Sequence, residues 1–275
     1  MPSANKTIAI VTTNLLNGFA AQLIWAIQTE SLNTDYDIVI YTAKSATNMG
    51  GVEFLYEKIA RDKKAGVVIV IAHSISDRAV DSFYRSGIIP VLIETRMKGV
   101  NSVRVDNEKG AYGAGVYMAQ KKKKKIGIII GDFCLVESQK ERLAGFTAAL
   151  KENNMAIGEN AVYEISKYNY QSGKDAFKYM LMNDVDAVFC AAGDYVAQGF
   201  LHEAIKQGIN FPYTMSLIGF DDIEVSADLG LTTVRQPLEE MGREAFKMAV
   251  DSMKKTGIPV REKIFDCSLI IRETA

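Results

Sequence analysis

The sequence predicts an α/β fold built from two lobes, each with a doubly wound parallel sheet. Continuous apolar runs alternate with helical patterns along the chain, which is typical of parallel strands that helices cover on both faces. Eight such units could close into one barrel, but the rhythm is interrupted between the fourth and fifth by "TRMKGVNSVRVDNEKG". Further elements follow the eighth unit and have no place in a plain barrel, so two lobes are favoured.

The repeating units can be placed in order along the chain. Apolar runs predict strands at residues 7–13, 36–42, 66–72, 88–94, 125–131, 161–165, 185–191 and 214–220. Amphipathic spacing predicts helices near residues 18–33, 50–63, 76–86, 107–120, 138–153, 171–183 and 195–207.

The elements after the eighth strand suggest how the lobes are joined. A strand is expected at 231–237, a long helix at about 237–255 and one final strand at 263–271. This order fits a chain that recrosses to the first lobe and returns. We expect an N-terminal lobe of residues 1–106 plus about 237–262, and a C-terminal lobe of residues 107–236 plus about 263–275.

Composition narrows the class of protein. Of 275 residues, 48% are hydrophobic and 24% charged, as in ordinary globular proteins that bury a sizeable core. The net charge is -1 with the signs interspersed, so no overall field would hold the chain on DNA or an anionic membrane. The one basic block, Lys121–Lys125, fits a solvated corner better than a phosphate-binding patch.

The expected compartment is the cytoplasm. Cys134, Cys190 and Cys267 are widely spaced among apolar neighbours, which is typical of small buried hydrophobes in a reducing compartment. The N-terminus lacks an export pattern, and no stretch approaches the roughly 18 apolar residues that a membrane span needs.

Motifs for common chemistry are missing from the sequence. It has no phosphate-binding P-loop, no nucleophile elbow and no H-E-x-x-H zinc motif. The glycines of Gly110–Gly115 lie within a helical pattern and fit close helix packing better than a nucleotide turn. We therefore expect no enzyme, no metal and no cofactor.

Polar side chains instead gather where the predicted strands end. Ligands of open α/β sheets bind beyond the carboxyl ends of the strands. Asp221 follows one strand, and other strand ends carry Thr13, Asn14, His73, Arg96 and Asp194. Because adjacent residues at a strand end point in different directions, we expect one of Asp221 and Asp222 to face a ligand and the other to orient the loop.

The stretch "SLIGFDDIEVSADLGLTTVRQPLEEMGREAF" resembles the C-terminal part of LacI/GalR (lac-repressor type) regulators. In those proteins a strand ends in G-[FY]-D-[DN], and L-T-T-[VI]-x-Q-P and a glycine-containing helix follow. Other segments agree in order, including "KERLAGFTAAL", so the resemblance covers nearly all of residues 7–272. It implies a periplasmic-binding-protein-like fold with a sugar-sized cleft between the two lobes.

The resemblance also implies a set of ligand-binding residues. Asp221 falls on the acid that accepts hydrogen bonds from ligand hydroxyls, Arg142 on the ligand-binding arginine, and Tyr168 on a stacking aromatic. Charged groups read hydroxyl patterns strongly, and an aromatic face covers C–H surface. The complete expected set is Thr13, Asn14, Phe19, His73, Thr95, Arg96, Arg142, Tyr168, Asp194, Asp221 and Gln236.

The implied function is the ligand-sensing core of a transcriptional regulator. Its effector would be a sugar, sugar phosphate, nucleoside or purine, and operator DNA would be bound through a helix-turn-helix headpiece that this chain lacks. We expect a truncated core that forms a homodimer with Trp25 near the interface. A solute-binding receptor for uptake or signalling is the alternative.

Three departures from the family pattern bear on the identity of the ligand. The chain has Gly193-Asp194 where relatives often have Asn-Asp, and it lacks the proline that commonly precedes L-T-T. The lysine run replaces a usual Gly-His-Arg turn.

Overall fold

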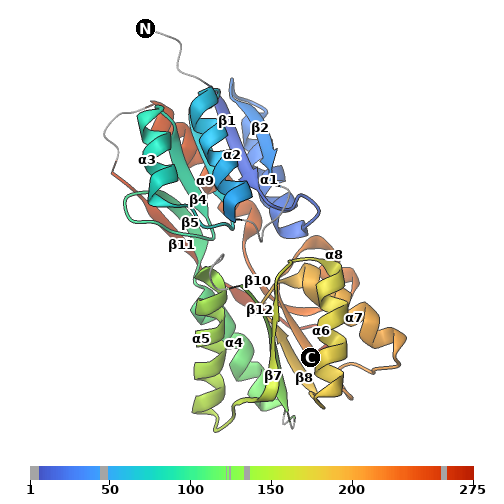
Figure 1. Ribbon diagram of the computed structural model, residues 1–275. Helices are drawn as coiled ribbons and strands as arrows, with labels where there is room; N and C mark the ends of the chain where they lie inside the picture. Colours follow the sequence, from blue (N-terminus) through green and yellow to red (C-terminus); the bar gives the residue numbers. More distant parts are fainter. Residues whose placement is uncertain (1–5, 44–48, 122, 124, 133–136, 255–258) are drawn as a thin grey trace. The chain divides into compact units, whose positions relative to one another are not determined.

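The chain forms two compact units, described here from a computed structural model (Figure 1). The structure describes residues 6–43, 49–121, 123, 125–132, 137–254 and 259–275. The N-terminal lobe comprises residues 1–105 and 237–265, and the C-terminal lobe comprises residues 106–236 and 266–275. The predicted α/β class with two doubly wound lobes is confirmed.

The N-terminal lobe has a sheet with strand order β11-β5-β4-β3-β1-β2, paired in parallel throughout the described residues. Its strands are β1 (Thr7–Thr12), β2 (Asp37–Thr42), β3 (Val67–Ile71), β4 (Ile89–Ile93), β5 (Asn101–Val105) and β11 (Glu262–Phe265). Its helices are α1 (Gly18–Ser31), α2 (Met49–Asp62), α3 (Asp77–Arg85) and α9 (Leu238–Lys254).

Helix α1 shows why the apolar spacing is a reliable signal. Phe19, Leu23, Ala26 and Ile27 recur at helical spacing, and all four are buried. A Cβ at Gly242 of α9 would lie 2.7 Å from the Ala26 Cβ, so the two helices pack at close range because this position is glycine.

The C-terminal lobe has a sheet with strand order β12-β10-β9-β8-β6-β7. Its strands are β6 (Ile126–Gly131), β7 (Ile157–Ile165), β8 (Ala187–Cys190), β9 (Ser216–Asp221), β10 (Thr232–Arg235) and β12 (Ser268–Ile270). Its helices are α4 (Asn107–Gln120), α5 (Glu137–Glu152), α6 (Tyr170–Met182), α7 (Asp194–Lys206) and α8 (Glu224–Asp228). Strand β12 pairs antiparallel with β10, and the remaining described pairs are parallel.

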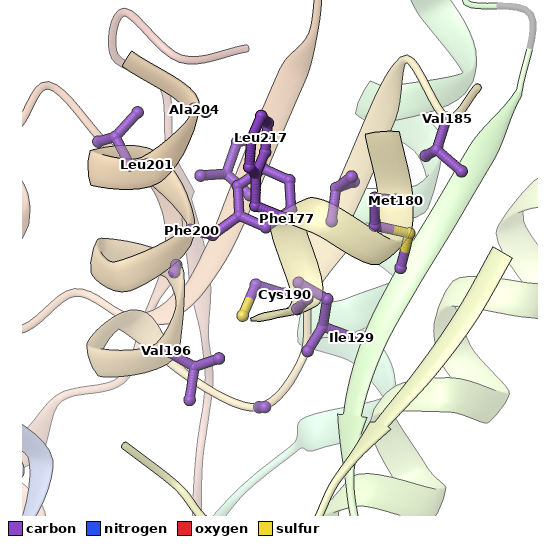
Figure 2. Packing of buried hydrophobic residues seen from close by; sticks show 14 of the residues in the cluster. Ile129, Phe177, Met180, Val185, Cys190, Val196, Phe200, Leu201, Ala204 and Leu217 are labelled. Atoms are coloured by element: carbon purple, nitrogen blue, oxygen red, sulfur yellow. The ribbon is translucent and has the colours of Figure 1, made fainter. Parts of the chain in front are cut away.

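Two apolar layers cover this sheet. Helices α6 and α7 pack on one side, where the rings of Phe177 and Phe200 meet edge to face with centroids 5.3 Å apart and Cys190 is fully buried (Figure 2). Phe146 of α5 stacks on Phe189 with centroids 4.7 Å apart in the second layer. The strands are therefore covered on both faces and their carboxyl ends remain at one edge.

The expectation of one final strand at 263–271 is wrong. The run contains the end of β11, which pairs with β5 in the N-terminal lobe, and all of β12, which pairs with β10 in the C-terminal lobe. The chain leaves one lobe after Phe265 and enters the other at Asp266. The run is mostly apolar, and its interruption at Asp266 alone does not reveal this change of lobe.

Other sequence features have local structural roles. The glycines of Gly110–Gly115 lie in α4 as expected, and a Cβ at Gly115 would lie 2.7 Å from the Ala149 Cβ. Lys123 donates to the carbonyl oxygens of Pro212 and Tyr213, at 2.7 and 2.9 Å. Cys267 is half-buried, whereas Cys134, Lys122 and Lys124 lie outside the described residues.

No helix in the described part of the chain is long and apolar enough to cross a membrane.

Candidate ligand-binding site

The carboxyl edge of the C-terminal sheet brings together five of the expected residues. Asp221 ends β9, Gln236 follows β10, Asp194 begins α7 after β8, and Tyr168 follows β7. Arg142 reaches the same edge from α5.

Arg142 is buried, with 4% of its surface exposed, and its side chain is held in a fixed orientation. Its Nε donates to Asn107 Oδ1 at 2.7 Å, and its Nη1 donates to the Ala191 carbonyl oxygen at 2.8 Å. The guanidinium carbon lies 3.6 Å from the centroid of the Phe220 ring, within cation–π range. The planar donor fork is thus oriented before any ligand arrives.

Asp221 faces this guanidinium. Its Oδ1 lies 4.0 Å from Arg142 Nη1, which is an ion pair longer than a hydrogen bond. Gln236 Nε2 donates to the same Oδ1 at 2.8 Å, and the Gln236 N–H donates to the Asp221 carbonyl oxygen at 3.1 Å. Asp221 is 5% exposed, so the acid and the arginine form a buried, oppositely charged pair.

Asp222 points elsewhere and ties down the loop. Its Oδ2 lies 2.6 Å from Arg235 Nε, and its Oδ1 lies 2.7 Å from Arg272 Nη1. Arg272 also donates to the Leu231 carbonyl oxygen at 2.7 Å. The two neighbouring acids therefore contact different groups, Arg142 and Gln236 for Asp221 and Arg235 and Arg272 for Asp222.

Asp194 lies beneath the same loop, fully buried. Its Oδ2 accepts from the Asp222 N–H at 2.9 Å and from Ser226 Oγ at 2.6 Å, and its Oδ1 accepts from Thr233 Oγ1 at 2.7 Å. Burial, and then the nearby charge of Asp221, raise the pKa of Asp194 to about 8. The structure therefore places this carboxyl against groups of its own lobe.

Tyr168 covers the end of β6. Its ring lies where a side chain at Gly131 would project, so glycine at that position makes room for the phenol. Burial raises the pKa of the Tyr168 hydroxyl, which is therefore neutral at physiological pH.

The remaining expected residues lie at the carboxyl edge of the N-terminal sheet. Thr13, Asn14 and Phe19 follow β1, His73 follows β3, and Thr95 and Arg96 follow β4.

These six side chains differ in exposure. Phe19, His73 and Thr95 are buried, Thr13 and Asn14 are half-buried, and Arg96 is exposed. His73 Nδ1 lies 2.9 Å from the Ser74 carbonyl oxygen, which can only accept, so Nδ1 carries the proton. The Phe19 ring belongs to the buried face of α1.

Sequence reasoning missed the residues that support the site. Asn107 orients Arg142, and Gln139 accepts from the Gly131 N–H at 2.9 Å while donating to the Ala191 carbonyl oxygen at 3.2 Å. Thr233 and Ser226 bind Asp194. Apart from the Gly131–Gln139 pair, these contacts join residues that are 32 or more positions apart, so local sequence patterns do not predict them.

Within the described ranges, no group of three or more histidine, cysteine, aspartate or glutamate side chains could hold a metal ion.

Comparisons with known proteins agree with this architecture. A family model described as a periplasmic binding protein-like domain matches residues 117–275. The HTH-type transcriptional repressor CytR of Escherichia coli (strain K12) is 26% identical over 275 residues, which cover 98% of this chain and 79% of the repressor.

Solved structures show the same fold. The transcription regulator CcpA of Lactococcus lactis has a TM-score of 0.85 at 22% identity, with 98% of this chain and 99% of that chain covered. A LacI family transcriptional regulator from Enterococcus faecium, solved with bound ribose, has a TM-score of 0.84 at 22% identity, with 98% of each chain covered. The chain is similar over nearly its whole length to LacI-type transcriptional regulators, and it belongs to the periplasmic binding protein-like domain family.

Proposed function

We propose that the protein senses a small hydroxyl-bearing effector, a sugar or a nucleoside, and passes its binding on to operator DNA through a helix-turn-helix headpiece outside this chain. It acts by binding and not by catalysis, in the cytoplasm where operator DNA is found. The named relatives are regulators, which favours this function over a solute receptor for uptake.

The pairing of Arg142 with Asp221 carries the proposal. A carboxylate only accepts hydrogen bonds and a guanidinium only donates them, so together they match vicinal hydroxyls, which do both. Both side chains are held by their own lobe, through Asn107 and Gln236, so little ordering is left for the binding step.

The sugar class is supported by the ribose bound in the Enterococcus faecium regulator, whose fold this chain shares. Ribose also forms the sugar moiety of nucleosides. A ribofuranose and a ribonucleoside therefore present the same vicinal 2- and 3-hydroxyls to the pair, and they differ in the base that replaces the anomeric hydroxyl.

A thermal-shift screen followed by calorimetric titration tests the proposal. The probes are D-ribose, D-xylose, cellobiose, adenosine, cytidine and hypoxanthine. A compound at 100 times its dissociation constant adds about 2.7 kcal/mol to the stability of the folded protein, so binding is easily detected. We expect a pentose or a nucleoside to shift the melting temperature.

Variants then locate the binding site. Asp221→Ala and Arg142→Ala should each lower the affinity for the bound probe at least about tenfold, since a charged hydrogen bond contributes roughly 1.5–3 kcal/mol. Asp228→Ala removes an exposed carboxylate of α8 in the same lobe and serves as the charge-matched control. A folded protein that binds none of the probes, or equal affinity in all three variants, would refute the assignment.

We also propose that the protein is a homodimer with Trp25 near its interface. Trp25 is 56% exposed on α1 and Leu32, just beyond this helix, is 74% exposed, whereas the opposite face of α1 is buried. Val39 and Ile40 of β2, at the edge of the sheet, are also exposed. Sedimentation at micromolar concentration should give a dimer, and Trp25→Ser should weaken it. A monomer would remove this proposal without affecting effector binding.

A further inference from the structure

We propose that Asp194 is a positioning residue, which holds the Asp221–Asp222 turn so that the Asp221 carboxylate is presented to the effector. The inference rests on the proposed function of Asp221 as the effector-binding acid. It gives Asp194 a different role from the ligand contact that sequence reasoning expects.

The turn must be stabilised by contacts with other residues because its backbone is strained. Asp221 has a φ of 121° and Asp222 a φ of 57°, so two consecutive residues with side chains adopt positive φ values. Such conformations are costly for residues other than glycine and persist only where the surroundings impose them. They cluster at sites where a side chain must be aimed in a specific direction.

Asp194 supplies that hold from beneath the turn. Its Oδ2 accepts the Asp222 N–H at 2.9 Å, which fixes the peptide that joins the two acids. Ser226 and Thr233 bind the same carboxyl, so Asp194 connects the turn to α8 and β10. With both oxygens engaged by its own lobe, Asp194 acts on the effector through Asp221.

Two glycines make this arrangement possible. A side chain at Gly219 would collide with Asp194 Oδ1, so glycine in β9 lets the carboxyl reach its partners. A Cβ at Gly193 would lie 2.6 Å from Asp221 Oδ2. Glycine at position 193 therefore leaves the space that the Asp221 carboxylate occupies.

Hydrogen exchange of the Asp222 amide tests whether Asp194 stabilises the turn, and it requires no effector. The readout is its exchange rate divided by that of the Ile218 amide in β9, because the ratio cancels a general loss of stability. Asp194→Ala should raise this ratio at least about tenfold. Asp194→Asn should restore it, since the amide oxygen can accept from Asp222 N–H and the amide nitrogen can donate to Thr233.

The matched control is Asp186→Ala. Asp186 Oδ1 accepts the Lys125 N–H at 2.9 Å, so this variant also removes a carboxylate from a backbone donor, at the opposite edge of the same sheet. It should leave the ratio unchanged. An unchanged ratio in Asp194→Ala, or an equal rise in Asp186→Ala, would overturn the proposal.

Titration with D-ribose then links the hold to binding. Asp194→Ala should lose at least about tenfold in affinity, while Asp194→Asn and Asp186→Ala should stay near wild type. Full affinity in Asp194→Ala together with a raised exchange ratio would show that the turn does not aim Asp221, and would overturn the inference. If the wild-type protein does not bind D-ribose, the proposed sugar is wrong. The ¹³C chemical shift of the Asp221 carboxyl in the same variants then shows whether Asp194 positions Asp221. It should move in Asp194→Ala and return in Asp194→Asn.

Discussion

The carboxyl edges of the two sheets are built differently, although both carry expected ligand residues. In the C-terminal lobe, Asp194 binds groups from the turn after β9, from α8 and from β10. In the N-terminal lobe, Asn14 Oδ1 accepts from the N–H of Leu16 at 2.9 Å, and His73 bonds to the carbonyl of its neighbour Ser74.

These contacts differ in how far apart the partners lie along the chain, although the N-terminal edge also has a longer-range contact, from Tyr56 Oη of α2 to the Ser74 carbonyl oxygen at 3.3 Å. Contacts between distant segments lock the geometry of an edge, whereas contacts within one turn shape only that turn. The C-terminal edge is therefore preorganised by contacts between distant segments of its own lobe. Its substitutions should be costly both for folding and for binding.

The largest effect is expected for Asp222→Ala, which breaks the ion pairs with Arg272 and Arg235. The Asp222 side chain is 5% exposed and that of Arg272 is 16% exposed. Removing one partner of a buried pair leaves the other charge uncompensated, so we expect a loss of about 3 kcal/mol in the free energy of unfolding. Urea unfolding followed by circular dichroism measures it.

An ion pair of the N-terminal lobe provides the comparison. Arg104 Nε lies 2.6 Å from Glu262 Oε1, as close as Arg235 to Asp222, but the Glu262 side chain is 42% exposed. Glu262→Ala should cost less, about 1 kcal/mol, because water screens the half-exposed Glu262 carboxylate and only one ion pair is lost, against two for Asp222→Ala. Equal losses in the two variants would contradict the distinction between the lobes.

A smaller effect, about 2 kcal/mol, is expected for Gly193→Ala. Gly193 has φ 104° and ψ 164°, a region that only glycine populates readily, and the new Cβ would press on Asp221 Oδ2. Unfolding free energy and D-ribose affinity should both fall.

Gly208→Ala separates strain from the contact with Asp221. Gly208 also has a positive φ, of 77°, but a Cβ there would meet nothing within 4 Å. This variant should lose stability and keep its affinity. Loss of affinity in Gly208→Ala would mean that binding responds to stability alone.

These comparisons show which parts of the molecule can be predicted from sequence. The apolar faces of helices such as α1 and the ends of buried strands depend on local spacing, so the fold and the positions of Asp221 and Arg142 follow from pattern and resemblance. The role of Asp194 could not be predicted, because Ser226 and Thr233 lie 32 and 39 residues away along the chain. A local pattern carries no information on contacts that form only after the sheet assembles.

The smallest effect concerns pH and comes from Asp194 itself. Its pKa is raised from 3.8 to about 8, by burial and by the charge of Asp221, so the folded protein holds a proton that the unfolded chain releases. The resulting stabilisation is complete below about pH 4 and is lost as the pH rises through about 8. Between about pH 6 and pH 7, wild type should lose roughly 1 kcal/mol more than Asp194→Asn, which mimics the neutral acid and cannot ionise. Urea unfolding of both proteins at the two pH values measures this difference, and other titrating groups, including Asp221, Asp222 and both histidines, are common to the two proteins. Parallel pH profiles would mean that Asp194 is already ionised in the folded protein, with its three donors outweighing burial and the neighbouring charge.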